Sequence, residues 1–203
     1  MLIRVTERNT TLWDEALDVV RNQYNRTYDA NIAPDPQYFV VIQSMTGKIL
    51  ACAGVTFADE SRLFSEQYLA NPIENVLSLR SDREVERANI VEIGSLVSHH
   101  PTAGRILVNM IPMLAWCMGA QFLLCTATPR VRAMMASCQI TFEPIEQADP
   151  SRLDNSQESW GSYYEQRPVT GFIQVDPKRS RFAAMTVSTI FTHAPVDLPK
   201  RVS

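Results

Sequence analysis

The run from Val91 to Thr128 constrains the fold most strongly, because a strand, a short loop, an apolar helix and a second strand follow one another directly in it. Residues 89–98 alternate with the two-residue period of a β-strand, and 121–128 form a second apolar run of strand length. Proline and glycine at 101–105 allow a sharp turn into the intervening helix. Strands joined by such a crossover lie parallel in one sheet, so the sequence predicts an α/β fold.

The remaining elements alternate in the same way and add an antiparallel part to the sheet. The segment from Thr11 to Asp14 resembles a capping box ahead of apolar residues at helical spacing. The turn from Ser44 to Gly47 separates two β-rich runs, which is a hairpin signal. The predicted elements are a helix at 12–28, antiparallel strands at 38–43 and 48–57, short helices capped by Asn71 and by Thr128, and a final strand at 171–175.

The composition is that of a soluble globular protein and argues against two classes of function. A chain of 203 residues that is 45% hydrophobic and 20% charged can bury the core of one domain. A net charge of -3 with scattered basic residues offers no surface for nucleic acid. The longest apolar helix is shorter than the roughly 20 residues that cross a bilayer, and the charged N-terminus does not resemble a signal peptide. We therefore expect a cytoplasmic protein without an integral membrane segment.

The cysteines and histidines do not form a pattern typical of a metal site. The four cysteines, Cys52, Cys117, Cys125 and Cys138, lie in apolar contexts without a CxxC pair, so we expect four buried free thiols. His99 and His100 have no acidic or cysteine partners at metal-ligand spacing. We expect them to contact phosphate or solvent, and no metal to be bound.

Five motifs occur in a fixed order between Leu12 and Val175: LFSEQYL with NPIE, then VEIGSL, FLLCTAT, ADPSRL and WGSYY. This set resembles the thermostable hemolysin family. The succession of a hairpin, a central strand with a glutamate, and a loop-helix-strand resembles the GNAT superfamily of N-acyltransferases. The wider architecture is similar to that of the acyl-homoserine-lactone synthases. The resemblance implies a single GNAT-like α/β domain at 1–178, with a central mixed twisted sheet flanked by helices.

The resemblance also implies a site for an acyl thioester. In such folds the fourth and fifth strands splay apart, and the pantetheine arm of coenzyme A or of an acyl carrier protein lies in the gap. The usual pyrophosphate motif, Gln/Arg-x-x-Gly-x-Gly/Ala, keeps only its last small residue here, which favours an acyl carrier protein or long-chain acyl-CoA over acetyl-CoA as co-substrate. No permanently bound cofactor is expected. The residues implied at the arm and at the phosphates are Ile93, Ser95, Val97, Thr102, Ala103, Gly104 and Arg105.

Glu92 is the leading catalytic candidate. Acyl transfer to an amine needs a base, and a carboxylate in a partly apolar cleft has its pKa raised toward a useful range. The alternative is a structural ion pair, for instance with Arg105 or Arg132. By resemblance, Tyr163 or Tyr164 would serve as the general acid.

Three further residues are candidates for the acceptor side of the site. Two of them are Glu66 in the LFSEQYL motif and Glu74 in NPIE. The alternative for each is an ordinary solvated position on a helix face. Trp160 lies in a polar loop with two tyrosines, where aromatic side chains with a polar group suit a pocket wall. The alternative for Trp160 is that it fixes the loop on the core.

The function implied is transfer of an acyl group from acyl-CoA or acyl carrier protein to a small amine. Two alternatives remain open: a membrane-active haemolysin, as the family's name suggests, and a catalytically inert domain that binds a thioester. The segment 179–203 is expected to be a C-terminal extension that packs on the domain or on a partner subunit, as in a homodimer.

Overall fold

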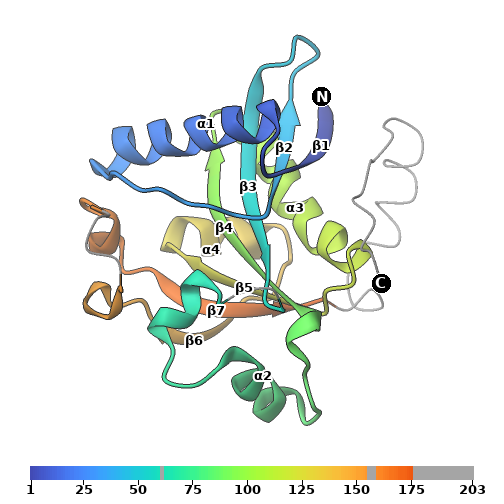
Figure 1. Cartoon of the computed structure of the whole chain (residues 1–203), viewed down its shortest axis with the longest axis vertical. Helices are drawn as coiled ribbons and strands as arrows, with labels where there is room; N and C mark the ends of the chain where they lie inside the picture. Colours follow the sequence, from blue (N-terminus) through green and yellow to red (C-terminus); the bar gives the residue numbers. More distant parts are fainter. Residues whose placement is uncertain (60–61, 155–158, 176–203) are drawn as a thin grey trace.

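A seven-stranded mixed sheet forms the centre of the molecule (Figure 1). The structure, a computed structural model, describes residues 1–59, 62–154 and 159–175. The strands lie in the order β1-β2-β3-β4-β5-β7-β6, and every neighbouring pair is antiparallel except β4 and β5. The strands are β1 (Leu2–Glu7), β2 (Tyr38–Gln43), β3 (Ile49–Phe57), β4 (Ile90–Ser98), β5 (Phe122–Ala127), β6 (Glu143–Gln147) and β7 (Val169–Gln174). The α/β fold with a mixed sheet is confirmed.

Helices cover both faces of this sheet. Alternation along β2 divides the core, because Phe39 and Val41 pack in the cluster of α1 while Val40 and Ile42 pack in the cluster of α3. Helix α2 adds a third cluster at the lower ends of β4, β5 and β7. The helices in the described ranges are α1 (Thr11–Tyr28), α2 (Ile73–Ser81), α3 (Pro101–Cys117) and α4 (Pro129–Ser137), with short 3-10 helices η1 (Phe64–Tyr68), η2 (Arg87–Asn89), η3 (Pro150–Arg152) and η4 (Tyr163–Gln166).

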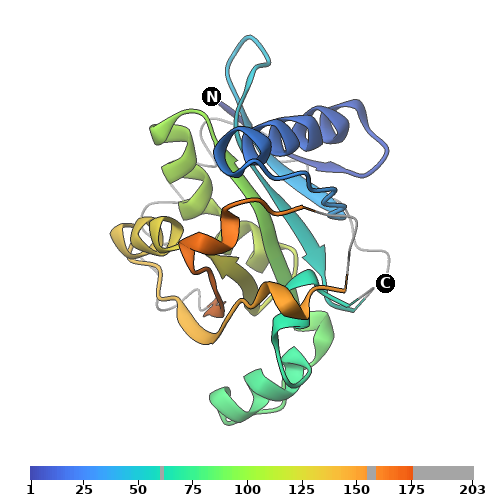
Figure 2. The ribbon, with the colours of Figure 1, turned by 90° about the vertical axis from the view of Figure 1, so that its left-hand side faces the viewer.

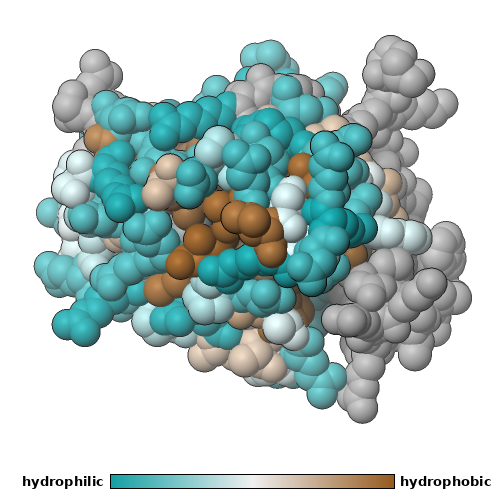
Figure 3. Space-filling view, turned by 90° about the horizontal axis from the view of Figure 1, so that it is seen from below, coloured by the Kyte–Doolittle hydropathy of each residue, from teal (hydrophilic) through white to brown (hydrophobic). Residues whose placement is uncertain are grey.

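The chain just before η4 contacts the C-terminal end of α1. The main-chain N–H of Ser162 donates to the carbonyl of Tyr28, and Figure 2 shows η4 beneath α1. On the lower face, where α2 lies, Figure 3 shows an apolar patch among hydrophilic side chains. Leu79 of α2 is 83% exposed.

Two local predictions differ from the structure, and one strand was not predicted. Helix α1 is capped by Thr10, whose hydroxyl accepts from the N–H of Trp13, so the cap lies one residue before the predicted box. Helix α2 starts after Pro72 without a side-chain cap, so Asn71 does not serve as the cap. Strand β1 was not predicted, although Ile3 and Val5 alternate with polar residues in it. A six-residue strand at the edge of a sheet has only this short pattern to identify it.

The sheet splits between β4 and β5, as the resemblance implied. Their pairing consists of Ile90 with Phe122, Val91 with Leu123, and Glu92 with Leu124, and it ends there although β4 continues to Ser98. A register shift against β3 lies in the same stretch, and Ser95 has a φ of 51°. Such a bulge bends a strand locally, which helps β4 to leave β5. The split therefore begins beside Glu92.

The four cysteines are free thiols, as expected, but they are not all buried. Cys52 and Cys125 are buried, Cys138 is half-buried and Cys117 is exposed at the end of α3, so the prediction of burial was wrong for Cys117. Within the described part of the chain, no helix has the length and apolar character to cross a membrane. The same residues contain no cluster of three or more potential metal ligands. The predicted extension at 179–203 lies outside the described residues.

Candidate active site

A cavity of about 500 Å³ opens where the sheet splits. This volume is within the usual range for a site that holds a small molecule. Glu92, Ile93, Gly94 and Ser95 of β4 form one side, and a Cβ atom added to Gly94 would meet nothing within 4 Å. The cavity is closed by η1, by the chain at 32–36 and by aromatic residues near η4.

Glu92 is buried at this cavity and accepts three hydrogen bonds from η1. Its Oε2 accepts from the N–H of Phe64 at 2.7 Å, while Oε1 accepts from the N–H of Ser65 at 2.9 Å and from the Ser65 hydroxyl at 2.5 Å. A carboxylate offers about four acceptor positions. One acceptor position on Oε2 is therefore left over, and Glu92 lines the cavity.

The electrostatic setting of Glu92 combines two opposing effects. Burial raises the pKa of its carboxyl group, and the hydrogen bonds from Ser65 and Phe64 lower it, with a net result above the ordinary glutamate value. A raised pKa makes the carboxylate a stronger base than an exposed glutamate. The side chain is thus suited to accept a proton.

A chain of hydroxyl groups leads from Glu92 into the other half of the split sheet. The Ser65 hydroxyl lies 2.8 Å from that of Thr126 on β5, and Thr126 lies 2.7 Å from the hydroxyl of Thr170 on β7. Ser65, Thr126 and Glu92 all line the cavity. Ser65 thereby connects the carboxylate on β4 to the strand from which β4 has separated.

The ion-pair alternative for Glu92 is not what the structure contains. Among the ion pairs of the described residues, none involves Glu92. Arg105 donates to the carbonyl of Ser137, and the Nε of Arg132 is buried without a hydrogen-bond partner in this part of the chain. Glu92 is held by neutral donors instead.

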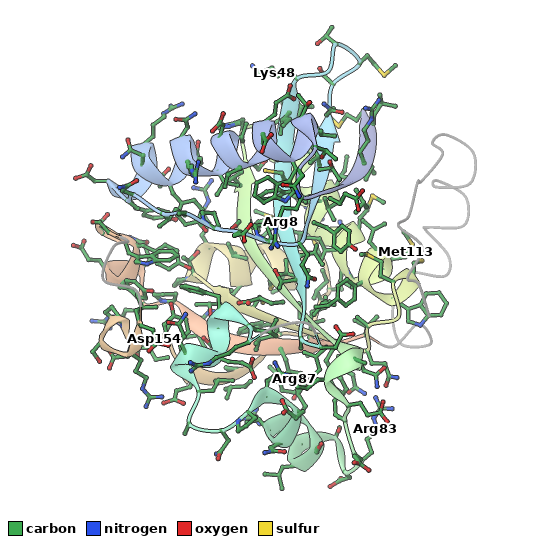
Figure 4. The ribbon with its side chains drawn as sticks, in the orientation of Figure 1. Arg8, Lys48, Arg83, Arg87, Met113 and Asp154 are labelled. Atoms are coloured by element: carbon green, nitrogen blue, oxygen red, sulfur yellow. The ribbon has the colours of Figure 1, made fainter. Side chains whose placement is uncertain are left out.

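Glu66 of η1 and Glu74 of α2 form a cluster with Arg87, and neither is among the cavity-lining residues. The guanidinium of Arg87 donates to both carboxylate oxygens of Glu66, at 2.8 and 2.9 Å, and to Glu74 at 2.7 Å. Figure 4 shows Arg87 between the lower end of the sheet and α2. This cluster joins η1 to α2 and to the start of β4.

Glu66 also accepts hydrogen bonds from the main chain. Burial alone would raise the pKa of its carboxyl group, but the bonds from Arg87, Leu63 and Ile73 outweigh burial and lower it. The Leu63 bond, 2.8 Å long, fixes the residue just before η1. Since η1 supplies all three donors to Glu92, the buried Glu66 carboxylate indirectly positions the candidate base.

The three aromatic candidates take different places. Trp160 and Tyr163 line the cavity, and their ring centroids are 5.3 Å apart. Tyr164 is outside the lining, and its hydroxyl lies 2.6 Å from that of Tyr68, which does line the cavity. Burial raises the pKa of Tyr163 well above the ordinary tyrosine value, so its hydroxyl keeps its proton at neutral pH.

The residues expected along the thioester divide into two groups. On β4, Ile93 and Ser95 line the cavity, whereas Val97 is buried in the core cluster beneath α1. A second, apolar cavity of about 30 Å³ between β4, β5, α3 and α4 shares Ile93 with the first.

The other group lies at the start of α3. Thr102 and Arg105 are exposed there, while Ala103 and Gly104 are buried. A Cβ atom on Gly104 would lie 2.8 Å from the Ser98 hydroxyl, so only glycine fits this close approach of helix and strand. The exposed first turn leaves main-chain N–H groups open to an anion.

Sequence reasoning missed the residues that hold Glu92 in place. Ser65 stands inside the quoted LFSEQYL motif, next to the glutamate that was chosen. Thr126 is the one hydroxyl side chain in the otherwise apolar strand β5, which is a weak but readable signal. Arg87 lies outside the quoted motifs, and no local pattern indicates its pairing with Glu66.

Comparisons with known proteins agree with this fold. The sequence profile described as "Thermostable hemolysin" matches residues 6–178. No curated protein sequence matches the chain. Among solved structures, the chain is similar to FeeM, an N-acyl amino acid synthase from uncultured soil microbes, with a TM-score of 0.59 and 11% identity over 88% of this chain and 98% of that one. The AHL synthase LasI has a TM-score of 0.56 and 12% identity, covering 86% and 90%. Apo TofI has a TM-score of 0.54 and 14% identity, covering 87% and 92%.

Proposed function

The chain belongs to the thermostable hemolysin family, and on the geometry of its site we propose that it is a GNAT-like acyltransferase. It moves an acyl group from the thioester of acyl-CoA or acyl carrier protein to a small amine. One observation carries the proposal: the buried Glu92 carboxylate stands where β4 leaves β5, at the side of a cavity large enough for a substrate. The fold shared with an AHL synthase and an N-acyl amino acid synthase agrees with this chemistry.

The split sheet provides a place for the thioester. Beyond Glu92 the edge of β4 that faces β5 has no pairing with it, so its main-chain groups are free to bind an extended pantetheine arm. Ile93 and Ser95 lie along this edge, and the phosphates of coenzyme A would meet Thr102 to Arg105 at the start of α3. The apolar cavity next to Ile93 would receive the first carbons of the acyl chain.

Glu92 acts as the base in the proposed reaction. The amine nitrogen attacks the thioester carbonyl carbon, the C–N bond forms and the C–S bond breaks. The proton lost from nitrogen passes to the free position on Oε2 of Glu92. The leaving thiolate takes a proton from the hydroxyl of Tyr163 on the cavity wall, with Tyr164 acting through Tyr68.

The experiment is a panel of acyl-CoAs and acyl carrier proteins with simple amines, in which release of free thiol is followed and binding is measured by calorimetry. Thiol release that depends on the amine supports the proposal. Binding without release would favour the inert thioester-binding domain. If no thioester binds, both the acyltransferase and the inert thioester-binding domain are excluded. Lysis of red cells without any thioester would favour the haemolysin.

A further inference from the structure

Five aromatic side chains form a continuous wall of the cavity. Tyr24 comes from α1, Phe64 and Tyr68 from η1, and Trp160 and Tyr163 from the chain before β7. The ring centroids of Phe64 and Trp160 are 5.4 Å apart, and those of Tyr24 and Tyr163 are 5.9 Å apart. Three distant parts of the sequence therefore meet at one aromatic surface.

Part of this wall is open. Phe64 is 37% exposed, although its main-chain N–H is fixed to Glu92, and Trp160 is half-buried. A flat apolar group that binds against an exposed aromatic face in a cavity of this size buries apolar surface, which favours binding. The same face attracts a cation, because the ring carries negative charge density above its plane.

The charges around the cavity favour a cation and disfavour a carboxylate. At the rim, Asp35 is paired with Arg8, and Arg62 is paired with Asp154. Figure 4 shows Arg8 just below α1 and Asp154 lower in the molecule, to the left. Glu92 adds a carboxylate that has no ion pair among the described residues. The carboxylate of Glu92 therefore has no ion-pair partner at the cavity. Arg62, the single cationic side chain among the described lining residues, is already paired with Asp154.

We infer that the acceptor is an arylalkyl primary amine without a carboxylate, which enters as its ammonium ion. Its ring lies against Phe64 and Trp160, and its nitrogen lies above Glu92. This inference rests on the proposed acyl transfer and specifies the acceptor of that site. The ammonium ion first loses one proton through Glu92 to solvent, and the neutral amine then attacks the thioester carbon. The proton lost from nitrogen on attack passes to Glu92, and the leaving thiolate takes its proton from Tyr163, so one proton in total is released.

The first test measures binding alone, without any acyl donor. Calorimetry compares 2-phenylethylamine with phenylalanine, which adds a carboxylate, and with 2-phenylethanol, which lacks the charge. We expect the amine to bind at least tenfold more tightly than either. Equal or tighter binding of phenylalanine or 2-phenylethanol overturns the inference, and so does failure of the amine to bind.

The second test uses matched tryptophan variants. Trp160→Leu should weaken binding of 2-phenylethylamine about tenfold, because one aromatic face is lost. Trp116→Leu is the control, since Trp116 is 49% exposed on α3 and does not line the cavity. If Trp160→Leu does not fold, Phe64→Leu replaces it, because Phe64 is partly exposed. Unchanged binding in the folded variant contradicts the inference.

Acyl transfer separates this inference from the proposed function. Tight binding of 2-phenylethylamine without thiol release from any thioester would support the inferred ligand class and contradict the proposed acyl transfer. Acyl transfer to phenylalanine or to a short aliphatic amine, without transfer to 2-phenylethylamine, would support the proposed acyltransferase activity and overturn the inferred acceptor class.

Discussion

The hydroxyl of Ser65 donates a 2.5 Å hydrogen bond to Oε1 of Glu92, and the N–H of the same residue donates a second bond to that oxygen at 2.9 Å. One residue of a short 3-10 helix therefore fixes the carboxylate that stands at the split in the sheet. Hydrogen bonds to the charged form of an acid lower its pKa, so Ser65 opposes the effect of burial on Glu92.

Replacing Ser65 with alanine removes one of these donors. A hydrogen bond to a charged group contributes about 1.5–3 kcal/mol, so we expect the pKa of Glu92 to rise by about one unit or more. The acid limb of the pH profile of kcat/KM should move to higher pH by that amount. Ser137→Ala, on an exposed position of α4, should leave the profile unchanged. An unshifted acid limb in Ser65→Ala would show that Glu92 is not the group that titrates.

The raised pKa of Glu92 also makes the stability of the protein depend on pH. The folded state holds the Glu92 proton more tightly than the unfolded state. Its contribution to stability is therefore complete below the unfolded pKa of about 4.3 and is lost as pH rises through the raised folded pKa. As pH rises through this range, the free energy of unfolding of wild type, measured in urea, should fall relative to that of Glu92→Gln. A difference that stays constant from pH 4 to pH 8 would contradict a raised pKa.

The Arg87 cluster should be important for stability. Arg87→Met leaves the buried carboxylate of Glu66 without its cation, and we expect the free energy of unfolding to fall by about 3 kcal/mol. The matched control is Arg62→Met, because Arg62 and Asp154 are exposed partners whose pair should contribute less than about 1 kcal/mol. Urea unfolding measures both changes. Equal losses in the two variants would show that the Glu66 pair is no more important than a surface pair.

The cavity can be filled from Gly94 without disturbing the fold. A Cβ atom at this position meets nothing within 4 Å, whereas one at Gly54 on the neighbouring strand would lie 2.9 Å from Pro36. Gly94→Ala should therefore keep the melting temperature of wild type and raise KM for the acceptor, while Gly54→Ala should lower the melting temperature. An unchanged KM in Gly94→Ala would place the acceptor elsewhere.

The sequence predicted the parts of this molecule that depend on local patterns. The crossover from 91 to 128 and the hairpin of β2 and β3 were readable because their apolar periods are long and their turns are marked by Gly and Pro. The cap at Thr10 and strand β1 were missed, since competing hydroxyls and a short edge strand give little signal.

The candidate site shows the same limit. Glu92 was identifiable as one carboxylate in an apolar strand. Its donors were not, because Ser65 reaches it from 27 residues away in the chain. The pairing of Glu66 with Arg87, 21 residues apart, likewise depends on tertiary contact. Both glutamates of the LFSEQYL and VEIGSL motifs look alike in sequence, and only their partners tell them apart.

Glu92→Gln tests the central claim most directly. The substitution keeps the shape of the side chain and removes its ability to accept a proton, so turnover of thioester and amine should fall on the order of a hundredfold or more. Circular dichroism of the variant should match wild type. Glu143→Gln, on β6 and away from the cavity lining, is the matched control and should keep full activity. Wild-type turnover in a folded Glu92→Gln protein, at every pH where wild type is active, would contradict the assignment of Glu92 as the base.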